Sequence, residues 1–144
     1  MKKIIPVILL MAISVFANGL SAQEISKDQM RIFQTDHLQN FKKAFKKEDY
    51  NKCFVIKENS YDLLSLSIKH QRKNNFDFLL NNTTDINRLC NNASPLMIAA
   101  KYGRAEMIKE LVKKGADKSL KNVNGETAKD FAVKNNHAEL ASIL

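Results

Sequence analysis

The sequence predicts an all-α fold, a solenoid in which short helix–turn–helix units stack side by side. Two observations predict it. Residues 94–117 carry the start and stop residues of two consecutive helices, and the same apolar spacing recurs 32 residues upstream and 33 residues downstream. One such unit cannot bury its apolar face alone, so about three or more must stack before the chain is stable. The length of 144 residues suits one domain of this kind.

The central unit shows the pattern most clearly. Ser94 can cap a helix whose first residue is Pro95, where the missing N–H costs nothing. Gly103 ends this helix, because glycine takes the left-handed C-cap conformation without strain. A second helix, which Gly115 ends in the same way, follows. Its apolar stripe, which can bury one face, consists of Met107, Ile108, Leu111 and Val112.

The two flanking copies are less regular. In the upstream copy, Gln71 and Thr83 stand where the central copy has its two glycines. The downstream copy opens with Thr127 in the place of the serine cap, and the sequence ends at Leu144, inside the second helix of that copy. We therefore expect a truncated C-terminal cap.

The segment from Asn92 to Asp117 resembles the ankyrin repeat signature. It has the Ser-Pro-Leu opening, the Ala-Ala pair, the glycine after the first helix and the closing Gly-Ala-Asp of that family. The resemblance divides the C-terminal part of the chain into repeats at 61–93, 94–126 and 127–144. It implies a rigid surface for protein recognition, and ankyrin proteins rarely catalyse reactions.

Residues 23–60 are expected to form an N-terminal capping helix and a degenerate repeat. After Ser26, which can act as a cap, apolar positions recur every three or four residues at Met30, Phe33, His37, Phe41 and Ala44. We expect this helix to cover the first repeat, and the alternative is that it lies on a membrane surface. The segment 41–56 is interpreted as a degenerate repeat, with an unrelated pair of capping helices as the alternative. The expected helices, with no sheet beyond short turns, are 27–46, 49–57, 62–71, 74–81, 95–102, 105–114, 128–134 and 137–143.

Residues 1–22 have the outline of a cleaved secretory signal peptide. Lys2 and Lys3 precede the apolar run 4–17, and small residues follow. We expect cleavage after Ala22, with cleavage after Ser21 as an alternative, and an uncleaved membrane anchor is the competing interpretation. An apolar run of this length is shorter than the ~20 residues of a transmembrane helix. The sequence therefore predicts a periplasmic or secreted protein of bacterial type, without stable membrane insertion.

The charge balance is basic. The net charge is +8, and removing residues 1–22 takes away two lysines and no acid, which leaves 21 basic and 15 acidic side chains. A basic surface can attract nucleic acid, an anionic membrane or an acidic protein. Export makes nucleic acid the poorest candidate, so we expect a protein partner with an acidic surface and a chain that is monomeric when free.

Aligning the repeats places three lysines at one position late in the first helix: Lys69, Lys101 and Lys134. We call them the lysine row. The adjacent row is His70, Tyr102 and Asn135. In ankyrin proteins such positions and the loops between repeats line the concave binding surface. The loop residues that the resemblance assigns to it are Leu89, Asn91, Asn92, Lys121, Val123, Asn124 and Glu126. Tyr102 is the best anchor, since tyrosine gives a large contact area at low entropy cost. The competing interpretation is a chance match in a lysine-rich, solvated face.

Catalytic and metal-binding patterns are missing from the sequence. His37, His70 and His137 lack metal-ligand spacing, and the sequence has no phosphate-binding glycine loop, nucleophile elbow or zinc-protease motif. We therefore expect a non-enzyme without a cofactor. Cys53 and Cys90 can form a disulfide, as an even count in an exported chain favours, or remain buried free thiols. The repeat alignment cautions that their Cα atoms could exceed the ~7 Å limit for a bridge.

Small size, export and the lack of catalytic residues suggest a specific role by a general resemblance to small exported bacterial ankyrin proteins. The hypothesis is an immunity protein that binds and neutralises a periplasmic antibacterial toxin, such as a phospholipase or a cell-wall hydrolase of a contact-dependent secretion system. Two alternatives remain. One is an envelope stress or scaffold protein that supports catalase or peroxide resistance, and the other is a secreted effector that binds host proteins.

Overall fold

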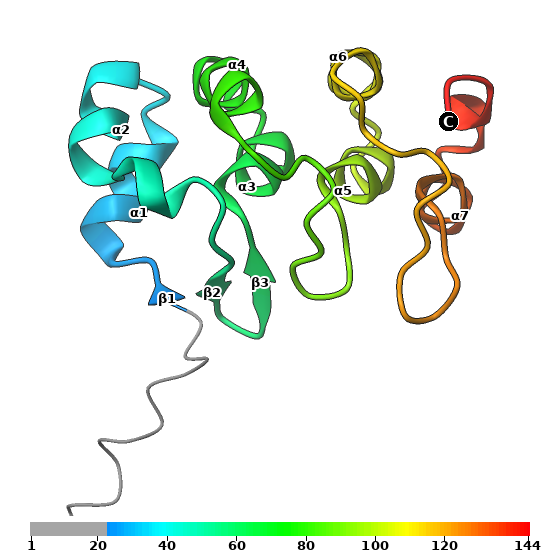
Figure 1. Cartoon of the computed structure of the whole chain (residues 1–144), viewed down its shortest axis with the longest axis horizontal. Coiled ribbons are helices and arrows are strands. Elements are labelled where there is room, and N and C mark those ends of the chain that lie inside the picture. Colours follow the sequence, from blue (N-terminus) through cyan, green and yellow to red (C-terminus); the bar gives the residue numbers. More distant parts are fainter. Residues whose placement is uncertain (1–22) are drawn as a thin grey trace, which may run out of the picture.

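The computed structural model describes residues 23–144, which form an elongated row of helix pairs (Figure 1). The pairs are α1 (Lys27–Gln34) with α2 (Leu38–Ala44), α3 (Leu63–Lys69) with α4 (Lys73–Asn82), α5 (Pro95–Lys101) with α6 (Ala105–Lys113), and α7 (Ala128–Lys134) with the 3-10 helix η3 (Ala138–Ser142). Helices α3, α5 and α7 lie side by side as an inner layer, α4 and α6 form an outer layer, and the connecting loops project from the opposite edge. The predicted helical solenoid is thus confirmed.

Each pair begins and turns in the same way. The residues that open the pairs accept a hydrogen bond from the backbone three residues on, and they are Ser26, Asp62, Ser94 and Thr127. The first helix of each pair is followed by a residue with positive φ, and these are Asp36, Gln71, Gly103 and Asn136. The upstream copy, residues 61–93, therefore ends its first helix as the central copy does, although only the central copy has glycine at this position.

The N-terminal unit differs from the prediction. The expected single helix 27–46 is broken at Asp36 (φ 55°) into α1 and α2, so the first helix pair begins at Ser26 and not near residue 41. The Asp36 carboxylate accepts from the backbone N–H groups of Asn74 (3.0 Å) and Asn75 (2.9 Å), which satisfies two free donors at the start of α4. The break is thus stabilised by the next repeat.

The predicted helix 49–57 is wrong. This segment holds the short 3-10 helix η2 (Lys47–Asp49) and the strand β2 (Phe54–Ile56). Strand β2 pairs antiparallel with β3 (Asn59–Tyr61) and parallel with β1 (Gln23–Glu24), so a three-stranded sheet stands where no sheet was expected. Aromatic and β-branched residues fill β2, and such residues favour strands.

The C-terminal unit has a short second element. Its second helix is the five-residue η3 in place of the expected helix 137–143, and Leu140 is its buried residue. The remaining predicted helices agree with α3 to α7 within two residues at each end.

The core runs without interruption through all four units. Its N-terminal part is aromatic, with Phe33, Phe41 and Phe45 fully buried against one another. Its central part is aliphatic, with Ala99 and Ala100 completely buried where the inner helices approach closely. Because Phe33 and Phe41 are inside, α1 and α2 cover the first repeat and do not offer these rings to a membrane. None of the helices within residues 23–144 has the length and apolar character of a membrane span.

Candidate protein-binding surface

The lysine row occupies equivalent places in the fold. Lys69, Lys101 and Lys134 are the last residues of α3, α5 and α7, the three adjacent inner helices in Figure 1. The adjacent row of His70, Tyr102 and Asn135 forms the C-caps of the same helices. Lysine in the last helical turn also interacts favourably with the negative end of the helix dipole. The repeat alignment therefore identified structurally equivalent positions.

The three lysine side chains have different surroundings. The Lys69 ammonium donates to the Tyr61 hydroxyl over 3.1 Å and lies 4.5 Å from the centre of its ring. Lys134 forms an ion pair with Glu126. Lys101 is exposed, with its Nζ atom 5.7 Å from the centre of the Tyr102 ring. The row therefore does not present three equally available charges.

Tyr102 lies among cations. The guanidinium of Arg104 is 5.9 Å from the centre of its ring. That guanidinium is fixed, because it also donates to the carbonyls of Ile68 (3.3 Å) and Lys69 (3.1 Å) at the end of α3. Burial raises the pKa of Tyr102 above its ordinary value, against an opposing effect of Lys69, and the nearby Tyr61 adds to the rise. The half-buried phenol thus keeps its proton at neutral pH.

His70 is a poorer candidate for charge recognition. Burial, together with the neighbouring charges of Lys69 and Arg72, lowers the pKa of this imidazole below its ordinary value. His70 is therefore neutral at physiological pH. It can exchange hydrogen bonds with a partner, but it does not extend the positive surface.

The loops between repeats are joined to one another by asparagine side chains. Asn91 and Asn92 form the tip of a tight turn with φ of 49° and 61°, closed by the bridge between Cys90 and Ala93. The Asn91 amide donates to Asn59 in the β2–β3 hairpin over 3.0 Å. The first two loops are thus connected at their tips.

The second connection runs to the loop before α7. The side chain of Asn92 accepts from the Val123 backbone N–H over 2.9 Å, and the Asn92 carbonyl accepts from the Asn122 amide over 3.2 Å. Buried Asn122 also accepts from the backbone N–H groups of Asn124 (3.0 Å) and Glu126 (2.9 Å). We call these three linked loops, 57–60, 89–93 and 121–126, the loop row.

The loop row exposes apolar as well as polar groups. Val123 is 86% exposed and Leu89 is 37% exposed. Lys121 and Asn124 are exposed beside them, whereas Glu126 is half-buried by its contacts with Lys134 and Asn122. Exposed apolar groups beside charged ones are typical of protein-recognition surfaces.

A disulfide joins the base of the β2–β3 hairpin to the second member of the loop row. Cys53 precedes β2 and Cys90 begins the next loop, and their Cα atoms are 5.6 Å apart. The sequence-based caution about this distance was wrong because it placed Cys53 in a helix. The cysteine lies instead at the base of the β2–β3 hairpin, beside the following loop.

Sequence reasoning missed four residues of this surface: Asn59, Tyr61, Arg104 and Asn122. A signal for the first was present, because Asn59, Asn91 and Asn124 recur at the repeat spacing. The roles of Tyr61 and Arg104 depend on contacts between repeats, and that of Asn122 on its fit within a loop, which residue spacing does not display.

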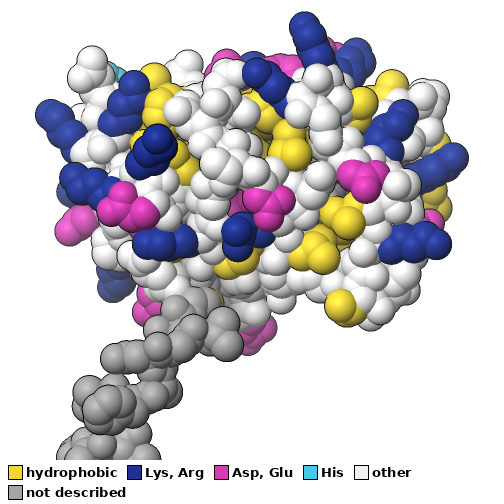
Figure 2. Space-filling view, viewed as in Figure 1, with side chains coloured by type: hydrophobic (Ala, Val, Ile, Leu, Met, Phe, Trp, Pro, Cys, Tyr) yellow, Lys and Arg dark blue, Asp and Glu magenta, His cyan; other side chains and the backbone are white. Residues whose placement is uncertain are grey.

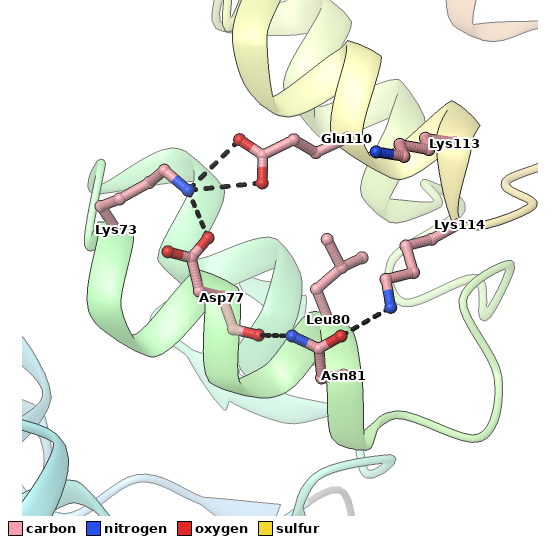
Figure 3. A pocket seen from close by; sticks show the side chains of 7 residues that line it. All are labelled: Lys73, Asp77, Leu80, Asn81, Glu110, Lys113 and Lys114. Carbon is pink, nitrogen blue, oxygen red and sulfur yellow. Dashed lines mark hydrogen bonds and ion pairs between the residues drawn. The ribbon is translucent and has the colours of Figure 1, made fainter.

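A groove of about 520 Å³ lies on the other side of the molecule, between α4 and α6 (Figure 3). Lys73 bridges Asp77 and Glu110 across it, with 3.2 Å to Glu110 Oε1, and Lys114 donates to Asn81 over 2.6 Å. The charged groups at its centre therefore satisfy one another and join the two helices. This groove is a poorer candidate for ligand binding than the loop row.

The overall charge distribution is mixed. Figure 2 shows basic side chains along the whole length of the displayed face, with acidic side chains between them. Hydrophobic side chains are visible in the C-terminal half, toward the projecting loops. No three His, Cys, Asp or Glu side chains gather as metal ligands would within the described part of the chain.

Comparison with known proteins agrees with this architecture. A family model for ankyrin repeats, in three copies, matches residues 56–144. No curated protein matches the sequence. The match begins in the β2–β3 hairpin, so it includes α3 to α7 and all three members of the loop row.

Proposed function

Because this chain belongs to the ankyrin repeat family, whose members are generally non-catalytic modules for protein–protein interaction, we propose that it is an immunity protein of the bacterial envelope. In this role it binds and neutralises an antibacterial toxin in the periplasm. The lysine row, the Tyr102 cluster and the loop row form the binding surface.

The observation that carries the assignment of this surface is the linkage of the loops. Three successive loops are tied by the Asn59–Asn91 and Asn92–Val123 hydrogen bonds, and a disulfide joins the base of the first hairpin to the second loop. A surface that is already ordered loses little conformational entropy on binding, so more of the contact energy contributes to affinity. Preorganisation of this kind favours tight inhibition of a toxin.

Two features support a place in the envelope. The first 22 residues have the composition of a secretory leader, and they lie outside the described residues. The pairing of Cys53 with Cys90 suits an oxidising compartment, since disulfides persist in the periplasm and outside cells.

A phospholipase or a cell-wall hydrolase is the proposed target. Such an enzyme acts in the compartment to which the leader directs this chain, and blocking its cleft needs binding alone. The mature chain retains an excess of basic side chains, which favours association with an acidic rim around such a cleft. This proposal requires no catalytic group on the ankyrin chain.

The test is affinity capture with the exported, oxidised protein as bait. The prey are an envelope fraction and the purified products of neighbouring genes. Wild type is compared with a Lys69→Ala/Lys101→Ala/Tyr102→Ala/Lys134→Ala variant. A charge-matched control removes three exposed lysines elsewhere: Lys43, Lys47 and Lys113. Circular dichroism checks that each variant is folded.

Capture of a toxin by wild type and by the control, but not by the binding-surface variant, would support the proposal. Co-expression of the wild-type chain should then protect cells from that toxin. Capture of a catalase would favour a role in envelope stress, and capture of a host protein would favour a secreted effector. Equal capture by all three baits would show that the binding surface lies elsewhere.

A further inference from the structure

We propose that the partner presents a carboxylate side chain to Lys101 and Tyr102 in the central repeat, and that Lys134 contributes little because Glu126 already neutralises it. This inference rests on the proposed protein-binding function and names the chemistry of the contact. It predicts that charge recognition is concentrated in one repeat.

The position eight residues before each lysine of the row explains the difference. Lys69 and Lys134 contact the residues at that position, Tyr61 and Glu126. The equivalent residue before Lys101 is Ala93, whose methyl group offers no hydrogen-bond or ionic partner. The central repeat therefore lacks the group that engages the lysine in the other two.

Lys134 is engaged by a carboxylate that is itself held in place. Glu126 accepts from Lys134 through Oε1 and from the Asn122 amide through Oε2, the latter over 2.9 Å. Lys134 is the first cause that lowers the pKa of Glu126, so the pair is charged at neutral pH. A partner carboxylate would have to compete with Glu126 to use Lys134.

The Lys101 ammonium is available to a partner. Among residues 23–144 it has neither an ion pair nor a hydrogen bond through Nζ, and its side chain is exposed beside the Tyr102 ring. Lys69 and Arg104 also border this tyrosine, and neither forms an ion pair with a carboxylate in that part of the chain. Three cations thus surround one phenol without an acidic group to balance them.

This arrangement suits a carboxylate. A carboxylate accepts hydrogen bonds through both oxygens, and charge-assisted bonds of this type are the stronger ones in proteins. The Tyr102 hydroxyl, which also interacts with Tyr61 and Lys69, keeps its proton because burial raises its pKa. Lys101 supplies the mobile positive charge that can reach a bound oxygen.

The adjoining loops indicate that the carboxylate belongs to a protein. Leu89 and Val123 expose apolar groups in the loops that precede α5 and α7, where a folded partner can cover them. A polyphosphate backbone would instead need closely spaced free cations, and Glu126 removes one of the three lysines from that use.

The test uses a hexaglutamate peptide with blocked ends as the acidic probe and hexaglutamine as its uncharged control. Both are titrated into the ¹⁵N-labelled, oxidised protein at low salt. We expect hexaglutamate alone to shift the amide resonances of Lys101, Tyr102 and Arg104. Lys101→Ala should weaken its binding about two- to fivefold. Tyr102→Phe, which keeps the ring, should weaken it less. Lys134→Ala/Glu126→Gln, which removes the ion pair without leaving an unpaired carboxylate, should leave it unchanged.

Glu126→Gln is the decisive companion variant. It removes the negative charge but keeps an amide oxygen that can accept from Asn122, so we expect a second cluster of shifts around Lys134. Equal weakening by the Lys101 and Lys134 variants, shifts centred on other lysines, or no binding of hexaglutamate would each overturn the inference. The proposed function would survive that failure if a captured partner still required the loop row.

Discussion

The guanidinium of Arg104 lies 3.1 Å from the carbonyl oxygen of Lys69 and so closes the first helix of the preceding repeat. Arg104 is the N-cap residue of α6, and the equivalent residue of α4, Arg72, donates to the side chain of Gln34 at the end of α1 over 2.9 Å. The N-cap side chains of α4 and α6 thus each contact the C-terminal end of the first helix in the preceding unit. These contacts help to hold the inner helices, and the lysine row with them, in register.

Replacing Arg104 tests this contact. Arg104→Met keeps much of the aliphatic stem but removes the donors to the α3 carbonyls, so we expect a loss of about 1–2 kcal/mol in the free energy of unfolding. Urea denaturation measures it. Arg31→Met is the control, because its side chain is 81% exposed and pairs only across the surface with Asp28. Equal stability of the two variants would contradict the structural role of Arg104.

Among the glycines of residues 23–144, Gly103 should be the least tolerant of substitution. Its φ is +67°, and a Cβ atom there would lie 2.7 Å from Cε1 of His137 in the next repeat. Gly103→Ala combines backbone strain with this clash, and we expect a loss of about 2–3 kcal/mol in the free energy of unfolding. Chemical denaturation of the purified variant measures the loss.

The Gly115→Ala substitution separates the cost of backbone strain from the cost of the clash. It also has positive φ (+96°), but nothing lies within 4 Å of a Cβ atom built there, so Gly115→Ala reports the backbone strain alone. Adding His137→Ala to Gly103→Ala should recover part of the lost stability by removing the clash. Equal costs of the two glycine substitutions, without recovery in the double variant, would place the whole effect in the backbone.

The disulfide should contribute strongly to stability. Closing the chain between Cys53 and Cys90, which are 37 residues apart, restricts the unfolded state, and Cys53→Ser/Cys90→Ser should lose about 4 kcal/mol in the free energy of unfolding. Thermal unfolding with and without a reductant measures it. The wild-type protein should become less stable on reduction and the serine variant should not change. Insensitivity of both proteins to reductant would contradict the role of this bond.

Asp62 should make stability depend on pH. It is the buried N-cap of α3, its carboxylate accepts from the Ser65 backbone N–H over 2.7 Å, and burial raises its pKa to about 6. The folded state therefore holds this proton more tightly than the unfolded state, whose pKa is near 3.8. The contribution of Asp62 to stability is fully present below pH 4 and decreases as pH rises through 6, by about 3 kcal/mol in all.

Asp62→Asn removes this ionisation but keeps a side chain that can cap α3. Denaturant titrations of both proteins between pH 4 and 7 measure the difference. Relative to the variant, wild type should lose stability across this range. A constant difference between the two proteins would show that Asp62 does not titrate in this window.

The fold was largely predictable where repeats recur, and less so at the N-terminal end. The break at Asp36 is invisible to periodicity, because α1 and α2 both direct apolar side chains such as Phe33 and Phe41 into one core, and the spacing continues across the turn. Gln71 likewise ends a helix without being glycine. Strand β2 has three residues, too few for an alternating pattern to emerge.

The equivalent places of the three lysines in the fold were predictable, but the surroundings of their side chains were not. Repeat spacing placed Lys69, Lys101 and Lys134 at the ends of adjacent helices. Which of these lysines is engaged depends on the residue eight positions earlier, just before the N-cap of the same helix, which is Tyr61, Ala93 or Glu126.

Hydrogen–deuterium exchange on the complex with a captured partner tests the central claim most directly. We predict slower exchange on binding in the loop row and at the C-terminal ends of α3, α5 and α7, with little change in the outer helices α4 and α6. Protection confined to α4 and α6, around the groove that contains Lys73, would contradict the proposed binding surface.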